Sequence, residues 1–329
     1  MQVLIAEQST AARFLLEELA REWGYDPVSV AEGTAAWQAL SRPDTPQLAI
    51  LDWVLPGTGG LELCTRVKAR EDGEFVYVIL LTNKGEGRTV GTALAAGADD
   101  FLTKPVDASE LQSRLAVGSR TVEYEKALHE KEYLVRLECY RALTDLAETR
   151  DQETGQHLRR MALYSESIAE GMDMDAEYVK NVKTFATLHD IGKVGIPDSI
   201  LRAPRRLLDH EFEIMKTHAS LGFDILRDRP TLELAAEIAH SHHERFDGKG
   251  YPLGLARREV PLSGRIIALA DVYDALRSRR PYKEPWTHQA AVDMIVKSSG
   301  TQFDPEVVDI FVTQVTVFEQ IAEEHSDPE

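Results

Sequence analysis

The stretch Leu48-Ala49-Ile50-Leu51-Asp52 places a carboxylate directly after a short apolar run. Such a run is typical of a buried strand. Similar runs recur over the first 120 residues, and amphipathic segments such as Ala11–Trp23 and Leu61–Arg70 separate them. The predicted strands are Val3–Ala6, Val28–Val30, Leu48–Leu51, Val76–Leu81 and Asp100–Leu102. This alternation predicts a five-stranded parallel sheet with helices on both faces.

Polar side chains follow four of these strands. Glu7 and Gln8 follow the first strand, Asp52 the third, Thr82 the fourth and Lys104 the fifth. Because ligands bind at the carboxyl ends of parallel strands, we expect these side chains to gather at one edge of the sheet. A carboxylate beside a hydroxyl and an ammonium can accept a phosphoryl group, whose oxygens the other two groups would hold.

Residues 1–120 resemble the receiver domain of response regulators, which has a flavodoxin-like fold. The resemblance implies that Asp52 accepts the phosphoryl group and that Lys104 binds it. It also implies that Thr82 and Phe101 form the switch, and that a sensor histidine kinase is a partner. An alternative is a receiver fold that serves only as a dimerisation scaffold.

One position departs from the receiver pattern. Receivers usually hold magnesium with two acidic residues after the first strand, and here the pair is Glu7 and Gln8. A neutral carbonyl oxygen at Gln8 should weaken the site for a hard cation. We therefore expect Asp52 to be phosphorylated only weakly unless magnesium is abundant.

The segment 121–147 is polar, free of proline and mostly helix-forming, and Gly118 interrupts the apolar stripe that runs into it. We interpret this segment as a connecting helix, which either pairs across a homodimer or packs on its own catalytic domain. From 148 to 329 the pattern is helical, with glycine and proline turns between the helices. The predicted helices are Gln156–Glu170, Ala176–His189, Asp209–Arg227, Leu232–His242, Leu262–Arg277 and His288–Lys297.

Two clusters in this helical part suggest a metal. One is His242-His243-Glu244-Arg245-Phe246-Asp247-Gly248-Lys249-Gly250-Tyr251-Pro252, and the other is His189-Asp190-Ile191-Gly192-Lys193. Glu153 and His157 are four residues apart, so a helix would place both on one face. An unpaired Asp271 inside a mostly apolar helix would be costly. It could instead pair with Arg265 or Arg277.

Residues 141–317 resemble the HD-GYP family of metal-dependent cyclic-dinucleotide phosphodiesterases, which implies an all-helical HD-type domain. Carried over motif by motif, the resemblance gives eight ligands: Glu153, His157, His189, Asp190, His218, His242, His243 and Asp271. His189, Asp190 and Lys193 would form the catalytic group, whereas His240 is an ordinary histidine. One ion cannot use eight ligands, so we expect two transition-metal ions, or three where Glu153 contributes. Imidazole with carboxylate and no thiolate suits iron, manganese or zinc better than magnesium, and we expect iron or manganese.

The resemblance also assigns substrate contacts. Lys193, Arg280 and Lys283 would contact phosphate, for which arginine and lysine are the usual partners. The run Arg280-Pro281-Tyr282-Lys283 could instead be a solvated basic turn. The Gly-Tyr-Pro loop is linked in the family to binding diguanylate cyclase domains.

These motifs predict a response regulator whose output hydrolyses cyclic di-GMP to pGpG, and further to GMP, by attack of a hydroxide bridging two metals. The alternatives are a phosphodiesterase for another cyclic dinucleotide, such as cyclic GMP-AMP, and a signalling module that binds dinucleotide or protein with little turnover.

Composition narrows the class of protein to which this chain can belong. The net charge of −18 argues against a DNA-binding protein. Cys64 and Cys139 are the only cysteines, which fits a reducing cytoplasm. No apolar run approaches the ~20 residues that a membrane helix needs. The start, Met1–Ile5, is predicted to be a strand and not a signal peptide.

Overall fold

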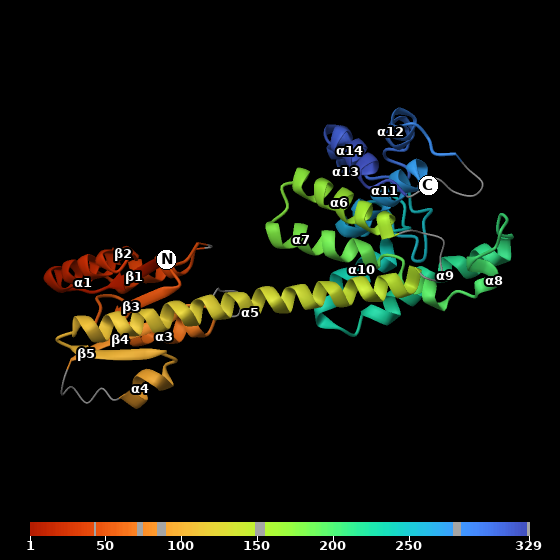
Figure 1. Ribbon diagram of the computed structural model, residues 1–329. Helices are drawn as coiled ribbons and strands as arrows, with labels where there is room; N and C mark the ends of the chain where they lie inside the picture. The colour runs from red at the N-terminus through yellow and green to blue at the C-terminus, as the bar shows by residue number, and fades with distance from the viewer. Residues whose placement is uncertain (43, 71–74, 84–89, 149–154, 279–283, 328–329) are drawn as a thin grey trace. The chain divides into compact units, whose positions relative to one another are not determined.

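The computed structural model describes residues 1–329 apart from 43, 71–74, 84–89, 149–154, 279–283 and 328–329. The chain divides into two compact units, Met1–Leu134 and Val135–Glu329 (Figure 1). This division falls inside the predicted connecting segment 121–147. Among the described residues, no helix combines the length and the apolar character needed to span a membrane.

The first unit is built on a five-stranded parallel sheet in the order β2-β1-β3-β4-β5. Its strands are β1 (Gln2–Ala6), β2 (Asp26–Val30), β3 (Leu48–Asp52), β4 (Tyr77–Asn83) and β5 (Asp100–Lys104). Its helices are α1 (Thr10–Glu22), α2 (Gly33–Leu40), α3 (Gly60–Lys68), α4 (Val90–Ala95) and the first part of α5 (Ala108–Glu148). The predicted flavodoxin-like arrangement is confirmed, with each of the five predicted strands present.

Alternate residues of the strands build two separate cores, because successive side chains of a strand point to opposite faces. On β3, Ala49 and Leu51 join a cluster with α2 and α3. Leu48 and Ile50 join the opposite cluster with α1 and α5. Every residue of β3 is buried, as expected for a strand covered on both faces.

Helix α5 is continuous through the whole predicted connecting segment. Gly118 interrupts the apolar stripe but not the helix. A Cβ at Gly118 would lie 2.7 Å from the ring of Tyr77 and 2.9 Å from Leu48. The glycine therefore lets α5 approach the sheet closely.

The described residues of the second unit are helical apart from turns and isolated bridges, as predicted. Its longer helices are α6 (Gly155–Gly171), α7 (Ala176–Phe185), α9 (Asp209–Leu226), α10 (Glu233–Ser241), α11 (Leu262–Arg277), α12 (His288–Lys297), α13 (Pro305–Thr313) and α14 (Val315–Glu324). The short helices are α8 (Asp198–Leu201), η1 (Ala186–Leu188), η2 (Ile191–Gly195), η3 (Pro230–Leu232) and η4 (Arg257–Glu259). Asp175, Thr287 and Asp304 start α7, α12 and α13 by accepting hydrogen bonds from backbone N–H groups.

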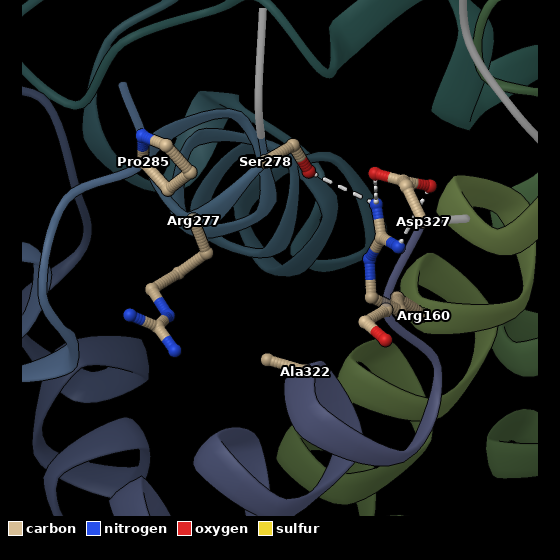
Figure 2. A pocket seen from close by; sticks show the side chains of 7 residues that line it. Arg160, Arg277, Ser278, Pro285, Ala322 and Asp327 are labelled. Carbon is tan, nitrogen blue, oxygen red and sulfur yellow. Dashed lines mark hydrogen bonds and ion pairs between the residues drawn. The ribbon is translucent and has the colours of Figure 1, made fainter. Parts of the chain in front are cut away.

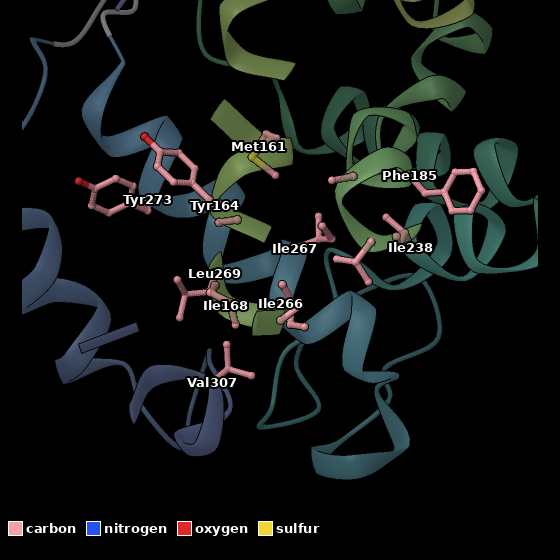
Figure 3. Close-up of a cluster of buried hydrophobic side chains, with 14 of the residues drawn as sticks. Met161, Tyr164, Ile168, Phe185, Ile238, Ile266, Ile267, Leu269, Tyr273 and Val307 are labelled. Atoms are coloured by element: carbon pink, nitrogen blue, oxygen red, sulfur yellow. The ribbon is translucent and has the colours of Figure 1, made fainter. Parts of the chain in front are cut away.

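Helix α11 runs through the core of this unit and is buried on most sides (Figure 3). Tyr273 of α11 meets Tyr164 of α6 edge to face, with ring centroids 5.3 Å apart. Tyr164 in turn stacks on Phe318 of α14 at 4.4 Å. Aromatic packing of this kind fixes the rotation of α11 about its axis, and thereby the direction in which Asp271 points.

Candidate metal centre and receiver site

The structure brings seven of the eight predicted metal ligands into two groups. Asp190, His218, His242 and His243 form the first group, and His157, His189 and Asp271 form the second. Within each group the potential ligand atoms all lie within 4.8 Å of one another. Glu153, the eighth predicted ligand, lies outside the described residues.

The ligands come from different elements that pack closely. His157 lies near the start of α6 and Asp271 on α11, while His242 and His243 follow α10. His189 and Asp190 lie between η1 and η2, and His218 lies on α9. The predicted helix Ala176–His189 ends earlier than expected, because α7 gives way to 3₁₀ turns after Phe185. These tighter turns carry His189 and Asp190.

The Asp190 carboxylate lies between the two groups. Its Oδ1 is 3.2 Å from Nε2 of His218 and 3.6 Å from Nε2 of His242. Its Oδ2 is 3.2 Å from Nε2 of His189. The Lys193 ammonium lies 2.8 Å from the same Oδ2. One carboxylate oxygen thus faces each group, which is the arrangement of a bridging ligand.

The imidazoles are held by the nitrogen that faces away from the site. Nδ1 of His189 lies 2.7 Å from the carbonyl oxygen of Ala186, and Nδ1 of His218 lies 2.6 Å from that of Met215. A carbonyl only accepts, so Nδ1 carries the hydrogen and Nε2 is left to bind a cation. Such outer hydrogen bonds orient metal-binding histidines in proteins.

Two buried polar atoms at the centre receive no hydrogen bond from the part of the chain that the structure describes, and a bound cation would interact favourably with both of them. Because Nδ1 of His189 and of His218 carries the ring hydrogen, the atoms 3.2 Å from Nε2 of His189 and from Oδ1 of Asp190 are not donors, and neither atom receives a hydrogen bond from a described residue. Buried polar atoms are rarely left without a partner, and an ion is one explanation. The residues present therefore fit a metal pair.

The charge states of His242, His243 and Asp190 fit metal binding, whereas burial of the His189 imidazole is outweighed by Asp190, which raises the pKa of His189. Burial lowers the pKa of the His242 imidazole, and burial together with the neighbouring His242 holds the pKa of His243 well below its usual value. Burial alone would raise the pKa of Asp190, but Lys193 and His189 hold it well below its usual range. Neutral imidazoles and ionised carboxylates are the forms that bind metal.

Asp274 and Arg160 belong to this site, although no role was predicted for either residue. Asp274 is only 1% exposed, and its Oδ2 lies 2.8 Å from Nδ1 of His157. Arg160 and His157 hold the pKa of Asp274 to about 2 despite its burial. The available signal was a second carboxylate three residues beyond Asp271 on the same buried helix.

The alternative partners proposed for Asp271 are engaged elsewhere. Arg265 forms an ion pair with Asp304, and Arg277 donates to the carbonyl oxygen of Trp286 at 2.7 Å. His240 lies outside both ligand groups and stacks on Phe223, with centroids 4.2 Å apart, as expected of an ordinary histidine.

A cavity of about 310 Å³ opens beside the ligands. His242, His243 and Asp271 line one part of it, and the basic residues Lys216 and Lys249 line another. Arg280 and Lys283, the other predicted phosphate contacts, lie outside the described residues.

The loop after the histidine pair is shaped by Glu244. Its carboxylate accepts hydrogen bonds from the backbone N–H groups of Leu253, Gly254 and Leu255 at 2.7, 3.0 and 3.1 Å. These bonds hold the loop against the site. There the ring centroid of Tyr251 lies 4.7 Å from the ring centroid of His243.

The predicted receiver site also comes together at the carboxyl ends of the strands. Nζ of Lys104 lies 2.8 Å from Oδ2 of Asp52 and 2.5 Å from Oε2 of Glu7. Burial raises the pKa of Asp52, against the opposing effect of Lys104. Thr82 is buried nearby on β4.

The two remaining predicted receiver residues differ in burial. The side chain of Gln8 is exposed, while that of Phe101 is half-buried.

Comparison with known proteins gives two domain matches. The model of the response regulator receiver domain matches residues 3–116, and that of the HD domain matches residues 141–307. The second match covers just over half of the chain.

Several curated proteins are similar over most of the chain. A cyclic di-GMP phosphodiesterase of Thermotoga maritima is 38% identical over 95% of this chain and 90% of its own length. The cyclic di-GMP phosphodiesterase response regulator RpfG of Xanthomonas campestris pv. campestris is 34% identical over 99% of this chain and 91% of its own. The 3'3'-cGAMP-specific phosphodiesterase 2 of Vibrio cholerae is 41% identical over 52% of this chain and 33% of its own.

Proposed function

This chain belongs to the family of response regulators that join a receiver domain to an HD domain, and we propose that its HD domain hydrolyses cyclic di-GMP in a metal-dependent reaction. The single observation that carries the proposal is the Asp190 carboxylate, whose two oxygens face two separate ligand groups. The names of the relatives that match over nine tenths of their length support the substrate.

Two bound transition-metal ions would lower the pKa of a water molecule to near neutrality and neutralise charge on the phosphoryl oxygens. The donor set of imidazole and carboxylate favours iron or manganese. A third ion, which would need Glu153, stays a prediction.

The chain's own residues supply position and charge. Lys193, held 2.8 Å from Asp190, places an ammonium beside the ligands, where it can contact a substrate phosphate. Lys216 and Lys249 line the adjoining cavity and can contact the second phosphate. Arg280 and Lys283 remain predicted phosphate contacts. We expect pGpG as the first product and GMP where a second cut follows.

One purified sample tests this function. Protein made with iron and manganese supplied should contain at least two ions per chain by elemental analysis and should release pGpG from cyclic di-GMP by chromatography. One ion or none would contradict the metal pair. Tight binding of cyclic di-GMP without product would favour the signalling module.

A second candidate substrate is cyclic GMP-AMP. It is favoured by the 41% identity to the cGAMP-specific enzyme of Vibrio cholerae. Faster turnover of cyclic GMP-AMP than of cyclic di-GMP on the same sample would make it the preferred substrate.

We further propose that a sensor histidine kinase controls this output through Asp52. Lys104 already contacts the Asp52 carboxylate, and the buried Glu7 lies beside it, whereas exposed Gln8 offers no charge to a magnesium ion. Added phosphate charge would act on Thr82 and Phe101. The Gly-Tyr-Pro loop is a proposed contact for diguanylate cyclase domains.

The receiver is expected to be phosphorylated weakly by small phosphodonors and to need high magnesium. Gln8→Asp should raise the affinity for magnesium because it restores an anionic oxygen ligand. Intact mass after a phosphodonor titration would measure this, with Asp52→Asn as the control. Stoichiometric phosphorylation of the wild type at low magnesium, with no gain in Gln8→Asp, would contradict the role given to Gln8.

An exposed apolar stripe on α5 supports a homodimer. Its members alternate 7 and 4 residues apart, and all six are exposed: Val117, Tyr124, Leu128, Val135, Cys139 and Leu146. The pattern therefore repeats every 11 residues, a period that keeps a stripe on one face of a helix and favours pairing with right-handed supercoil. This period also explains why no regular heptads are present.

A parallel, in-register pair would bring the two Cys139 residues together. We expect mild oxidation to link two chains and Cys139→Ser to abolish the link, because Cys64 is fully buried. Non-reducing electrophoresis measures the link, and light scattering measures the mass. A monomeric mass at micromolar concentration would contradict the dimer.

A further inference from the structure

A small cavity of about 170 Å³ is lined by residues of α6, α11, α14 and the segment after α14. Arg160 lines it, although this arginine is only 3% exposed. Figure 2 shows the Arg160 guanidinium between Ser278 and Asp327, with Arg277 across the cavity. A buried guanidinium is costly unless its donors are satisfied, so the partners of Arg160 identify what it does.

The inner edge of Arg160 holds Asp274. Nε donates to Oδ1 at 2.6 Å, and Nη2 donates to Oδ2 at 2.9 Å. This two-point fork fixes the plane of the carboxylate. The same Oδ2 accepts from Nδ1 of His157, whose ring belongs to the second ligand group. The orientation of His157 therefore depends on Asp274, and that of Asp274 on Arg160.

The outer edge of Arg160 is held by the segment after α14. Nη1 donates to the carbonyl oxygen of His325 at 2.7 Å and to Oδ1 of Asp327 at 3.2 Å. Nη2 lies 3.4 Å from Oδ2 of Asp327. Because a guanidinium is planar and rigid, fixing its outer edge also fixes the direction of its inner fork.

We propose that Asp327 is a positioning residue for the metal centre, acting through Arg160 and Asp274 on His157. The segment after α14 would then set the metal affinity of the group formed by His157, His189 and Asp271. This inference rests on the proposed metal pair. It assigns Asp327 a part in the reaction through two intervening side chains, those of Arg160 and Asp274.

A purely structural role is the competing explanation, since Arg160 also ties α6 to α11. The two roles differ in what they change. Loss of a structural tie lowers the stability of the metal-free protein. Loss of a positioning contact lowers metal affinity in the second group alone. Outer partners of metal ligands change affinity by roughly 10–100-fold.

The test compares Asp327→Asn with Glu323→Gln. Both changes remove one negative charge from the same region, but Glu323 is an exposed residue of α14. Iron or manganese is titrated out of the full-length protein with a chelator, and melting of the metal-free protein is recorded in parallel. Both substitutions are repeated in a His157→Ala background.

We expect Asp327→Asn to lose one ion at a lower chelator concentration, with an affinity roughly 10-fold weaker, at the low end of the range for such partners. Glu323→Gln should match the wild type, the metal-free proteins should melt alike, and the difference should vanish in His157→Ala. Equal metal release from Asp327→Asn and Glu323→Gln would overturn the proposal, as would an undiminished effect in His157→Ala. Fewer than two ions in the wild type would overturn the proposed metal pair itself.

Discussion

Asp190→Ala is expected to reduce the metal content from two ions per chain to none and to bring hydrolysis of cyclic di-GMP down to background. The reason is the position of this carboxylate between the groups, with Oδ1 3.2 Å from His218 and Oδ2 3.2 Å from His189. Removing it takes a ligand from both ions at once. It also leaves the Lys193 ammonium, now 2.8 Å from Oδ2, without that anionic partner.

His157→Ala is the matched comparison, because His157 belongs to the second group alone. This variant should keep one ion per chain, bound by Asp190, His218, His242 and His243. Elemental analysis of the two purified variants, with circular dichroism to confirm folding, distinguishes them. One retained ion in Asp190→Ala would contradict a bridging carboxylate, and loss of both ions in His157→Ala would mean that the two groups do not bind separately.

Seven of the eight ligands that the family resemblance implied come together in the structure, and the sequence could name them because short motifs place their imidazoles and carboxylates among apolar helical residues. The strands were predictable for a related reason, since a buried parallel strand such as β3 is apolar along its whole length. The ligand motifs and the apolar strands are both short stretches of sequence. They can therefore be recognised without knowing how the rest of the chain folds.

Asp274 and Arg160 were not predictable in the same way, because their roles depend on burial and on partners distant in sequence. Asp327 lies 167 residues from Arg160, and no periodicity relates them. The end of α7 was also misplaced, since the change from α-helical to 3₁₀ turns at Ala186 leaves the apolar pattern intact. Gly118 interrupts the apolar stripe for a reason that the stripe does not show, because the missing side chain lets α5 approach the side chains of Tyr77 and Leu48.

Among substitutions that add a single methyl group in the metal centre, Gly192→Ala is expected to have the largest effect on stability and on metal binding. Helix α9 packs directly on η2, and a Cβ at Gly192 would overlap the carbonyl oxygen of His218 and the amide nitrogen of Gly222. Both obstacles are backbone atoms, which cannot rotate away. Relief would require α9 to move from η2, and therefore His218 to move from Asp190.

Overpacking of this kind typically costs about 1–3 kcal/mol, and a backbone-to-backbone overlap belongs at or above the upper end. We expect Gly192→Ala to lower the free energy of unfolding by about 3 kcal/mol or more. It should also weaken binding of the ion held by the first group, because Oδ1 of Asp190 and Nε2 of His218 separate. Urea denaturation of the metal-free protein and elemental analysis measure the two effects.

Gly195→Ala, on the same short helix, is the control. A Cβ there would lie 2.7 Å from the Cδ1 methyl of Leu221, the far end of a side chain that can change rotamer. The loss of unfolded-state entropy on replacing glycine favours the folded state by about 0.4–1 kcal/mol, which offsets much of this contact. We therefore expect Gly195→Ala to change stability by less than about 1 kcal/mol and to keep both ions. If the two variants unfolded alike, the close approach of α9 to η2 would not be what holds His218 against Asp190. The first ligand group would then owe its geometry to the metal and not to the packing of the chain.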